Sequence, residues 1–170
     1  MRKFYACWFA LQFLVLVVNA QICESGDCES GKGTAKLPNG SYTGEFKKGK
    51  YNGQGTFTYK SGAIYTGQFE NGVFSGIGKL VKDGNTFEGS FKNDKPNGEG
   101  KLTTPRGDVY TGSFVDYKKN GQGTYVWAAG HKYVGNWVND KRQGQGAIYL
   151  SNGKKQYEGE WENDLPKSGN

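Results

Sequence analysis

The sequence predicts an all-β protein, an elongated single-layer twisted antiparallel sheet of stacked β-hairpin repeats. Three observations predict this fold. A short aromatic–glycine motif recurs about every 23 residues, a G-x-G pair and a closing glycine follow each copy, and apolar and polar residues alternate within each copy. A helical alternative fails, because the chain has 28 glycines and each one in a helix interior costs about 1 kcal/mol relative to alanine.

The first strand of each predicted hairpin holds two aromatic rings with a glycine midway between them. In the copy YTGEF, Tyr42, Gly44 and Phe46 share one face of the strand, and Thr43 and Glu45 share the other. A ring can lie flat over a neighbouring strand only where that strand lacks a Cβ, so we expect the rings to cover glycines. The motif recurs at Tyr42/Gly44/Phe46, Tyr65/Gly67/Phe69, Phe87/Gly89/Phe91, Tyr110/Gly112/Phe114, Tyr133/Gly135/Trp137 and Tyr157/Gly159/Trp161.

The second strand of each hairpin holds the G-x-G pair. Such pairs also occur in nucleotide loops, but those sites need one loop that leads into a helix or covers a lysine and acidic metal ligands. Here every complete copy has the pair, so we expect both of its glycines to receive neighbouring rings. The pairs are Gly53/Gly55, Gly76/Gly78, Gly98/Gly100, Gly121/Gly123 and Gly144/Gly146.

A tight turn is predicted between the two strands of each hairpin. The position of Gly49 in the first turn is held by Gly72, Asp94, Asp140 or Asp164 in others, and these residue types tolerate positive φ. Tyr117 stands at the equivalent position of one turn. We therefore expect that turn to differ in shape.

The segment at 1–20 is a different kind of sequence. Arg2 and Lys3 precede an apolar run at 4–18, and Ala20 offers a small residue for cleavage. This pattern predicts a secretory signal peptide at 1–20, helical and cleaved, and a secreted, periplasmic or extracellular protein. The alternative is an uncleaved N-terminal membrane anchor, although the run is shorter than the roughly 20 residues that span a bilayer.

Two cysteines follow the predicted signal, in the sequence CESGDC. Exported proteins can hold disulfides, and Gly26 favours a small closed ring, so a Cys23–Cys28 bridge is predicted within a short segment at 21–30. A metal site would need further ligands. A redox pair is expected to have two intervening residues, whereas here there are four.

The charge is mildly basic. The chain has a formal charge of +6, and removal of Arg2 and Lys3 leaves 22 − 2 = 20 basic against 16 acidic residues. Basic residues in the mid-repeat turns would align along one edge of the sheet and contact an anionic surface, or else they are solvated charges that guard the edge. No nucleic-acid partner is expected. The residues are Lys47, Lys48, Lys50, Lys95, Lys118, Lys119, Lys141 and Arg142.

The motif Y-x-G-x-[FW]-x-x-G/D, followed by G-x-G and a closing glycine, resembles the MORN repeat over residues 31–169. The resemblance implies an elongated, groove-bearing sheet, protein scaffolding, membrane-proximal positioning or dimerisation; binding of acidic phospholipids has been proposed for the family. Phe87, Tyr117 and the final LPKSGN depart from the pattern, and the last hairpin is expected to be incomplete. The array at 31–170 divides into a half repeat at 31–41, full repeats at 42–64, 65–86, 87–109, 110–132 and 133–156, and a partial repeat at 157–170.

The sequence predicts no enzyme, cofactor or metal. The single histidine, His131, lies in a turn without a nucleophile or carboxylate set around it. Glu158 and Glu160 are paired acids on one strand face, which glycosidases also use, but such pairs are common on solvated strands. Asn39 begins an N-glycosylation sequon, which is relevant only in a eukaryotic secretory pathway.

Two functional hypotheses remain. The first is an exported, non-catalytic protein-binding or scaffolding surface. It depends on the rings: either a single-layer sheet leaves some of them reachable, and exposed aromatic surface is typical of binding sites, or the rings only cover the glycines and little aromatic surface is left. The alternative is a peripheral membrane module that binds acidic phospholipid headgroups through its basic turns. The identity of the partner and the oligomeric state are not predicted, although a dimer is compatible with the resemblance.

Overall fold

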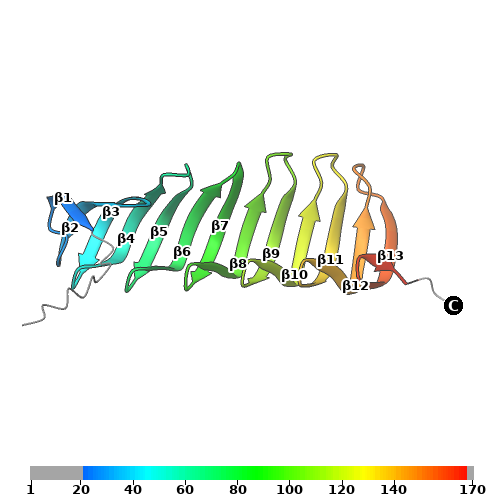
Figure 1. The fold of residues 1–170 in the computed structure, drawn as a ribbon. Coiled ribbons are helices and arrows are strands. Elements are labelled where there is room, and N and C mark those ends of the chain that lie inside the picture. Colours follow the sequence, from blue (N-terminus) through cyan, green and yellow to red (C-terminus); the bar gives the residue numbers. More distant parts are fainter. Residues whose placement is uncertain (1–20, 168–170) are drawn as a thin grey trace, which may run out of the picture.

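The structure, a computed structural model, describes residues 21–167 and consists of one open antiparallel sheet. Its 14 strands follow one another in sequence order, so each strand pairs with its neighbours along the chain (Figure 1). The predicted signal peptide and its helix at 1–20, and residues 168–170, lie outside the described residues. The single-layer hairpin array is confirmed.

The strands alternate between the opening and the G-x-G strand of each repeat. They are β1 (Ile22–Gly26), β2 (Lys32–Leu37), β3 (Gly40–Lys47), β4 (Lys50–Tyr59), β5 (Ile64–Glu70), β6 (Val73–Lys82), β7 (Asn85–Lys92), β8 (Lys95–Thr103), β9 (Val109–Val115), β10 (Lys118–Val126), β11 (Lys132–Val138), β12 (Lys141–Tyr149), β13 (Lys155–Glu162) and β14 (Leu165–Pro166).

The opening rings cover glycines, as predicted. Tyr42 is fully buried and lies over Gly44 of its own strand and Gly55 of β4. A Cβ built on Gly55 would lie 2.5 Å from a ring carbon of Tyr42, closer than packed atoms approach. The Tyr42 hydroxyl also donates a hydrogen bond to the Glu45 carbonyl oxygen at 2.8 Å. This arrangement is why the repeat requires glycine at the second position of G-x-G.

The glycines beneath the rings form one continuous row across the sheet. Gly55, for example, pairs with Gly44 on one side and with Gly67 on the other. At every glycine of the row an added Cβ would meet the opening ring of the same repeat, so these motif glycines are structural positions that support the rings. The row consists of Gly44, Gly55, Gly67, Gly78, Gly89, Gly100, Gly112, Gly123, Gly135, Gly146 and Gly159.

The first glycine of each G-x-G pair has a different role from the one predicted. In β4, Gly53 has φ +61° and the Glu45 side chain, not a ring, beside it. Gly44 pairs with Gly55 and Glu45 pairs with Asn52, so β4 has two residues more than β3 at this point. A bulge bends its strand, so these glycines curve the sheet rather than receive rings. The other four complete repeats have the same two-residue bulge and a positive φ at Gly76, Gly98, Gly121 and Gly144.

The aromatic residues form a continuous ladder along the sheet. Tyr42 meets Phe46 of its own strand edge-on at 5.1 Å between ring centroids, and Phe69 of the next repeat edge-on at 4.9 Å. The same pair of contacts continues to Trp161. Edge-to-face pairs each contribute about 0.5–1.5 kcal/mol beyond their burial. The rings thus join each repeat to the next.

The mid-repeat turns all have the same backbone conformation, with positive φ at both central residues. Tyr117 has φ +72° and Asp116 has φ +47°, close to the values of Asp140 (+70°) and Asn139 (+49°). The prediction of a differently shaped turn at Tyr117 is therefore wrong. The Tyr117 hydroxyl donates a hydrogen bond to the Asp94 carbonyl oxygen at 2.8 Å, and this contact helps to hold a residue that rarely adopts such a φ.

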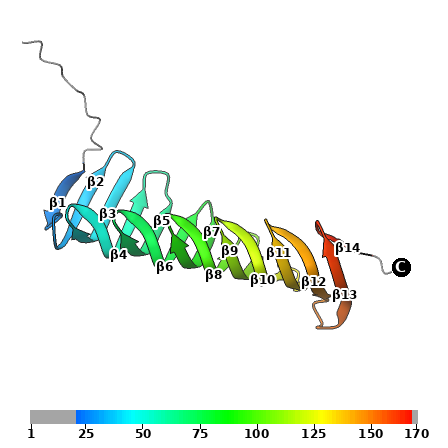
Figure 2. The same ribbon diagram turned by 90° about the horizontal axis from the view of Figure 1, so that it is seen from below.

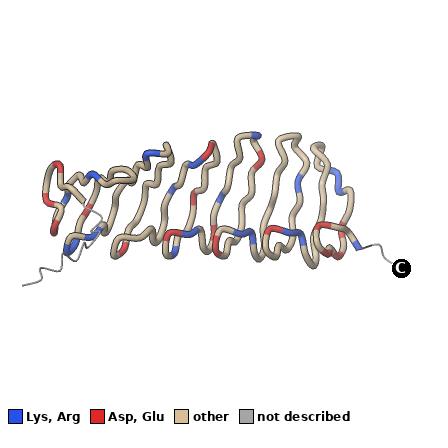
Figure 3. Tube along the Cα trace, viewed as in Figure 1, with Lys and Arg blue, Asp and Glu red and all other residues tan. Residues whose placement is uncertain are grey.

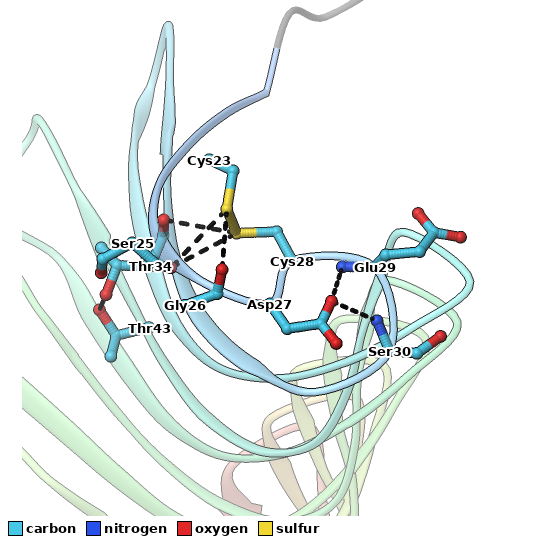
Figure 4. The surroundings of a disulfide bond; sticks show 9 residues. All are labelled: Cys23, Ser25, Gly26, Asp27, Cys28, Glu29, Ser30, Thr34 and Thr43. Carbon is cyan, nitrogen blue, oxygen red and sulfur yellow. Dashed lines mark hydrogen bonds between the residues drawn. A yellow bond between two sulfur atoms is a disulfide. The ribbon is translucent and has the colours of Figure 1, made fainter.

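The two ends of the sheet differ. At the N-terminal end, segment 21–30 adds the strand β1, which the sequence analysis did not foresee, and the Cys23 and Cys28 sulfur atoms lie at disulfide distance (2.10 Å) within it (Figure 4). Asp27 shapes the turn that follows, because its carboxylate accepts hydrogen bonds from two backbone N–H groups. At the C-terminal end, β14 has only two residues, in agreement with the predicted incomplete hairpin.

Candidate binding surface

The aromatic face of the sheet is the inside of a trough. The bulges bend the strands, and Figure 2 shows the resulting curvature of the sheet. Tyr59 and Pro38 near one edge and Gly72 and Asp94 at the other line one hollow of about 370 Å³. We call this concave aromatic face the trough and the row of mid-repeat turns the turn edge.

The ladder rings lie beneath the trough surface and are not available to a partner. Tyr65 and Tyr110 are fully buried, and Trp137 is 5% exposed. Of the two alternatives for the motif rings, the structure therefore shows that they cover the glycines, because the curved sheet packs them against one another and on the glycine row. The buried ladder rings are Tyr42, Phe46, Tyr65, Phe69, Phe87, Phe91, Tyr110, Phe114, Tyr133, Trp137 and Trp161.

The reachable apolar side chains of the trough belong to the end of each G-x-G strand and the closing turn after it. The period-2 pattern of the G-x-G strand predicts an apolar residue on the glycine face, as at Leu80, Leu102, Tyr125 and Ile148, but it does not distinguish these positions as a reachable group. They are half-buried and pack on the ladder: Leu37, Tyr59, Leu80, Leu102, Tyr125, Trp127 and Ile148.

One position changes its chemistry along the trough. It is the second residue of each G-x-G strand, which stands opposite the second ladder ring: Tyr51, Phe74, Pro96, Lys119 and Arg142. Tyr51 stacks on Tyr42 at 4.0 Å between centroids, and Phe74 stacks on Tyr65 at 3.7 Å. The same position is therefore aromatic in the first two repeats and cationic in the last two complete ones.

The two cations are enclosed by rings and one carboxylate each. The Lys119 ammonium lies 5.3 Å from the Trp137 ring and 3.3 Å from Asp140 Oδ1, and the Arg142 guanidinium lies 4.3 Å from the Trp161 ring. The Lys119 and Arg142 side chains are only 16% and 19% exposed. Local sequence places both residues among the basic surface contacts, because their carboxylate partners lie 21 and 22 positions later.

The turn edge is charged with both signs, as Figure 3 shows. Neighbouring turns lie side by side because a backbone hydrogen bond joins each to the preceding repeat. The Asp140 N–H, for example, donates to the Lys119 carbonyl oxygen at 3.0 Å. Lys95 pairs with Asp116 at 3.6 Å, and Lys141 donates to the Asn163 side chain at 3.3 Å. The predicted alignment of basic turn residues exists, but acidic residues of the next turn alternate with them.

The first turn is the exception. Lys47, Lys48 and Lys50 line one polar hollow of about 590 Å³ on the outer side of β3–β6, together with Glu70. Within residues 21–167, none of these three lysines has a carboxylate oxygen within 4.0 Å of its ammonium nitrogen. Lys118 of the fourth turn is also exposed without such a contact in the described chain.

The remaining candidates of the sequence analysis lie apart from the trough surface. Glu158 pairs with Lys155 at 2.5 Å, and Glu160 pairs with Lys167 at 3.2 Å. His131 lies in a closing turn, where its carbonyl oxygen accepts a hydrogen bond from Trp127 at 3.0 Å. In the described part of the chain no three His, Cys, Asp or Glu side chains are grouped as metal ligands, and no helix there has the length and apolarity to cross a bilayer.

The fold and the trough define an open β-hairpin repeat protein. A MORN-repeat profile matches residues 42–64, 65–86, 87–109, 110–132, 133–155 and 157–167, and the chain belongs to the MORN-repeat family, a family of non-catalytic repeats. The half repeat predicted at 31–41 is outside these matches; it supplies β2 and the start of β3.

Comparison with curated proteins gives no match. Among solved structures, the chain is similar to the SAS-4 (dCPAP) TCP domain in complex with a proline-rich motif of Ana2 (dSTIL) of Drosophila melanogaster. The two chains are 13% identical, the alignment covers 92% of this chain and 96% of that chain, and the TM-score is 0.29. A TM-score this low supports no conclusion about this chain.

Proposed function

We propose that this protein is an exported, non-catalytic repeat protein that acts as an elongated protein-binding or scaffolding surface through its trough. The observation that supports this most directly is the row of half-buried apolar side chains above the ladder, including Tyr59, Tyr125 and Trp127. Aromatic groups held by packing beneath them lose little entropy on binding and are favoured at interface hot spots.

Export rests on the predicted signal at 1–20 and is supported by the Cys23–Cys28 pair, since disulfides persist in oxidising compartments. The trough also contains backbone and side-chain polar groups at its two edges, such as Asp94 and Asn39 beside the same hollow. An apolar floor with polar rims is the usual composition of a protein interface.

The test is a pull-down from the exported fraction with wild type and a trough variant, Tyr59→Ser with Trp127→Ser. The matched control is Ile64→Ser with Ile77→Ser, because these isoleucines are 40% and 64% exposed on the outer face. Thermal unfolding of each variant shows that the sheet is intact. We expect the trough variant to lose partners that the control retains in both 0.15 M and 1 M NaCl. Equal recovery by both variants contradicts the proposal.

The alternative, a peripheral membrane module, is favoured by one observation: the Lys47, Lys48 and Lys50 cluster, which lacks carboxylate partners among residues 21–167. Each cation near an anionic bilayer contributes about 1 kcal/mol. Sedimentation with vesicles of phosphatidylcholine and phosphatidylserine, mixed four to one, tests it. Binding that disappears in the triple Lys→Gln variant and at 1 M NaCl supports the alternative, and no binding at 0.05 M NaCl excludes it.

A further inference from the structure

Three aspartates of the turn edge are held by the same hydrogen bond. Asp94 Oδ1 accepts the N–H of Phe74 at 2.8 Å, Asp140 Oδ1 accepts that of Lys119 at 2.9 Å, and Asp164 Oδ1 accepts that of Arg142 at 2.9 Å. In each case the aspartate carboxylate therefore faces the equivalent position of the preceding repeat, which is the second residue of its G-x-G strand.

At two of these places the chain supplies a cation. Lys119 and Arg142 lie 3.3 Å and 3.1 Å from the carboxylates of Asp140 and Asp164, and each lies over aromatic rings. At the third place the residue is Phe74, so Asp94 faces a ring instead of a charge. Among the described residues, no lysine or arginine nitrogen lies within 4.0 Å of a carboxylate oxygen of Asp94.

The space beside Asp94 is open and walled by aromatic groups. A hollow of about 230 Å³ is lined by Tyr59, Phe74, Tyr117 and Asp94, with Leu80 and Lys82 among the other lining residues. Asp94 also lines the larger hollow of about 370 Å³, together with Tyr59 and Phe74. Tyr117 is 53% exposed, and burial and the Asp94 charge both raise its pKa, so the ring and the carboxylate share one environment.

We propose that this hollow, the Asp94 subsite, binds an arginine side chain of the partner segment that occupies the trough. A guanidinium group stacks on an aromatic face and pairs with a carboxylate. This chain makes the same combination internally, where Arg142 lies between Trp161 and Asp164. The partner's arginine supplies at Asp94 the positive charge that Lys119 and Arg142 supply to the aspartate of the next repeat. Lys82 also lines the hollow, and its positive charge repels the guanidinium group and weakens its binding.

The Asp94 subsite rests on the proposed function, because the arginine belongs to a partner segment that is bound in the trough. The probe is N-acetyl-arginine amide, compared with N-acetyl-citrulline amide, which has nearly the same shape but no charge. Both are titrated at constant ionic strength into ¹⁵N-labelled protein that begins at residue 21. We expect arginine to shift the amide signals of Phe74, Asp94 and Tyr117, and citrulline to shift them at least fivefold less.

Three variants sharpen the test. Asp94→Asn keeps an oxygen for the Phe74 N–H and tolerates positive φ, and we expect it to lose arginine binding at least fivefold. Asp83→Asn makes the same charge change at another exposed turn residue with positive φ (+51°), and it should bind as wild type does. Phe74→Lys installs the cation of the fourth repeat and should block the subsite. Equal shifts with citrulline, or unchanged binding by Asp94→Asn, overturn the proposal.

The result of the arginine titration can be distinguished from the result of the pull-down. If arginine fails to bind while the trough variant loses its partners, the Asp94 subsite is wrong and the trough remains the binding surface. If the trough variant keeps its partners, the proposed function fails whatever the arginine titration shows.

Discussion

Phe87 is the only opening ring of the described repeats that lacks a hydroxyl group. In the other five, the tyrosine donates a hydrogen bond to the carbonyl three residues later, at 2.8 to 3.1 Å. The Phe87 ring occupies the same place, over Gly89 and Gly100. The Ser90 carbonyl at the equivalent position therefore lacks the donor that its counterparts have.

Phe87→Tyr should stabilise the sheet by about 1 kcal/mol, because a typical intramolecular hydrogen bond contributes about that much. The reciprocal change Tyr65→Phe should destabilise it by a similar amount, since it removes a 2.8 Å bond to the Gln68 carbonyl. Urea unfolding measures both. A destabilised Phe87→Tyr variant would show that the hydroxyl does not fit and that the third repeat is packed differently.

The buried tyrosines make stability depend on alkaline pH. Burial first, and the Glu45 charge second, raise the pKa of Tyr42 to about 12, and burial raises that of Tyr51 to about 12. In the unfolded chain these groups ionise near pH 10. Between pH 10 and 12 the unfolded state therefore binds fewer protons than the folded state, so stability is complete below pH 10 and falls as pH rises through that window.

Tyrosinate absorbance at 295 nm tests this expectation. In the folded protein the buried tyrosines should titrate later than exposed ones, and the urea midpoint should drop between pH 10 and pH 12. If all the tyrosines titrate near pH 10 without unfolding, the ladder is less buried than the structure shows.

At the scale of the hairpin, glycine has two separate uses. Gly55 has no room for a side chain, because the Tyr42 ring lies against it. Gly62, in the closing turn, has φ +88° and nothing within 4 Å of an added Cβ. The first position is restricted by contact, and the second only by its backbone conformation.

Gly55→Ala should destabilise the protein by about 2–3 kcal/mol, because the buried Tyr42 ring cannot move away. Gly62→Ala should cost only about 1 kcal/mol, the strain of a side chain at positive φ. Chemical unfolding of the two variants compares them directly. Equal effects would mean that ring contact does not explain the glycine in G-x-G.

The hairpins were predictable from the sequence because strand period, turn residues and ring–glycine spacing are all local signals. The two-residue bulge was not, since Gly53 and Gly55 look alike in sequence and differ only in φ and in what lies above them. Nor was the enclosure of Lys119 and Arg142, which depends on aspartates one repeat away. The prediction of a different turn at Tyr117 is wrong for a related reason. The register of the flanking strands, and not the residue at the turn, determines the conformation of this turn.

At the scale of the whole molecule, each strand contacts its sequence neighbours, so a local change should stay local. Removal of the Cys23–Cys28 bridge, by Cys23→Ser with Cys28→Ser, should increase amide exchange in β1 and leave β5 to β13 unchanged. Hydrogen exchange followed by mass spectrometry measures it. Increased exchange throughout the sheet would contradict this modular behaviour.

Of the proposals, the use of the trough as the protein-binding surface is the central one, and photo-crosslinking tests it most directly. Benzoylphenylalanine is placed at Trp127 in the trough, at Thr66 on the outer face, or at Lys48 in the first turn, and each variant is irradiated in the exported fraction. We expect a protein adduct from position 127 and none from position 66 or 48. Adducts from position 48 or 66 without one from 127 would contradict it.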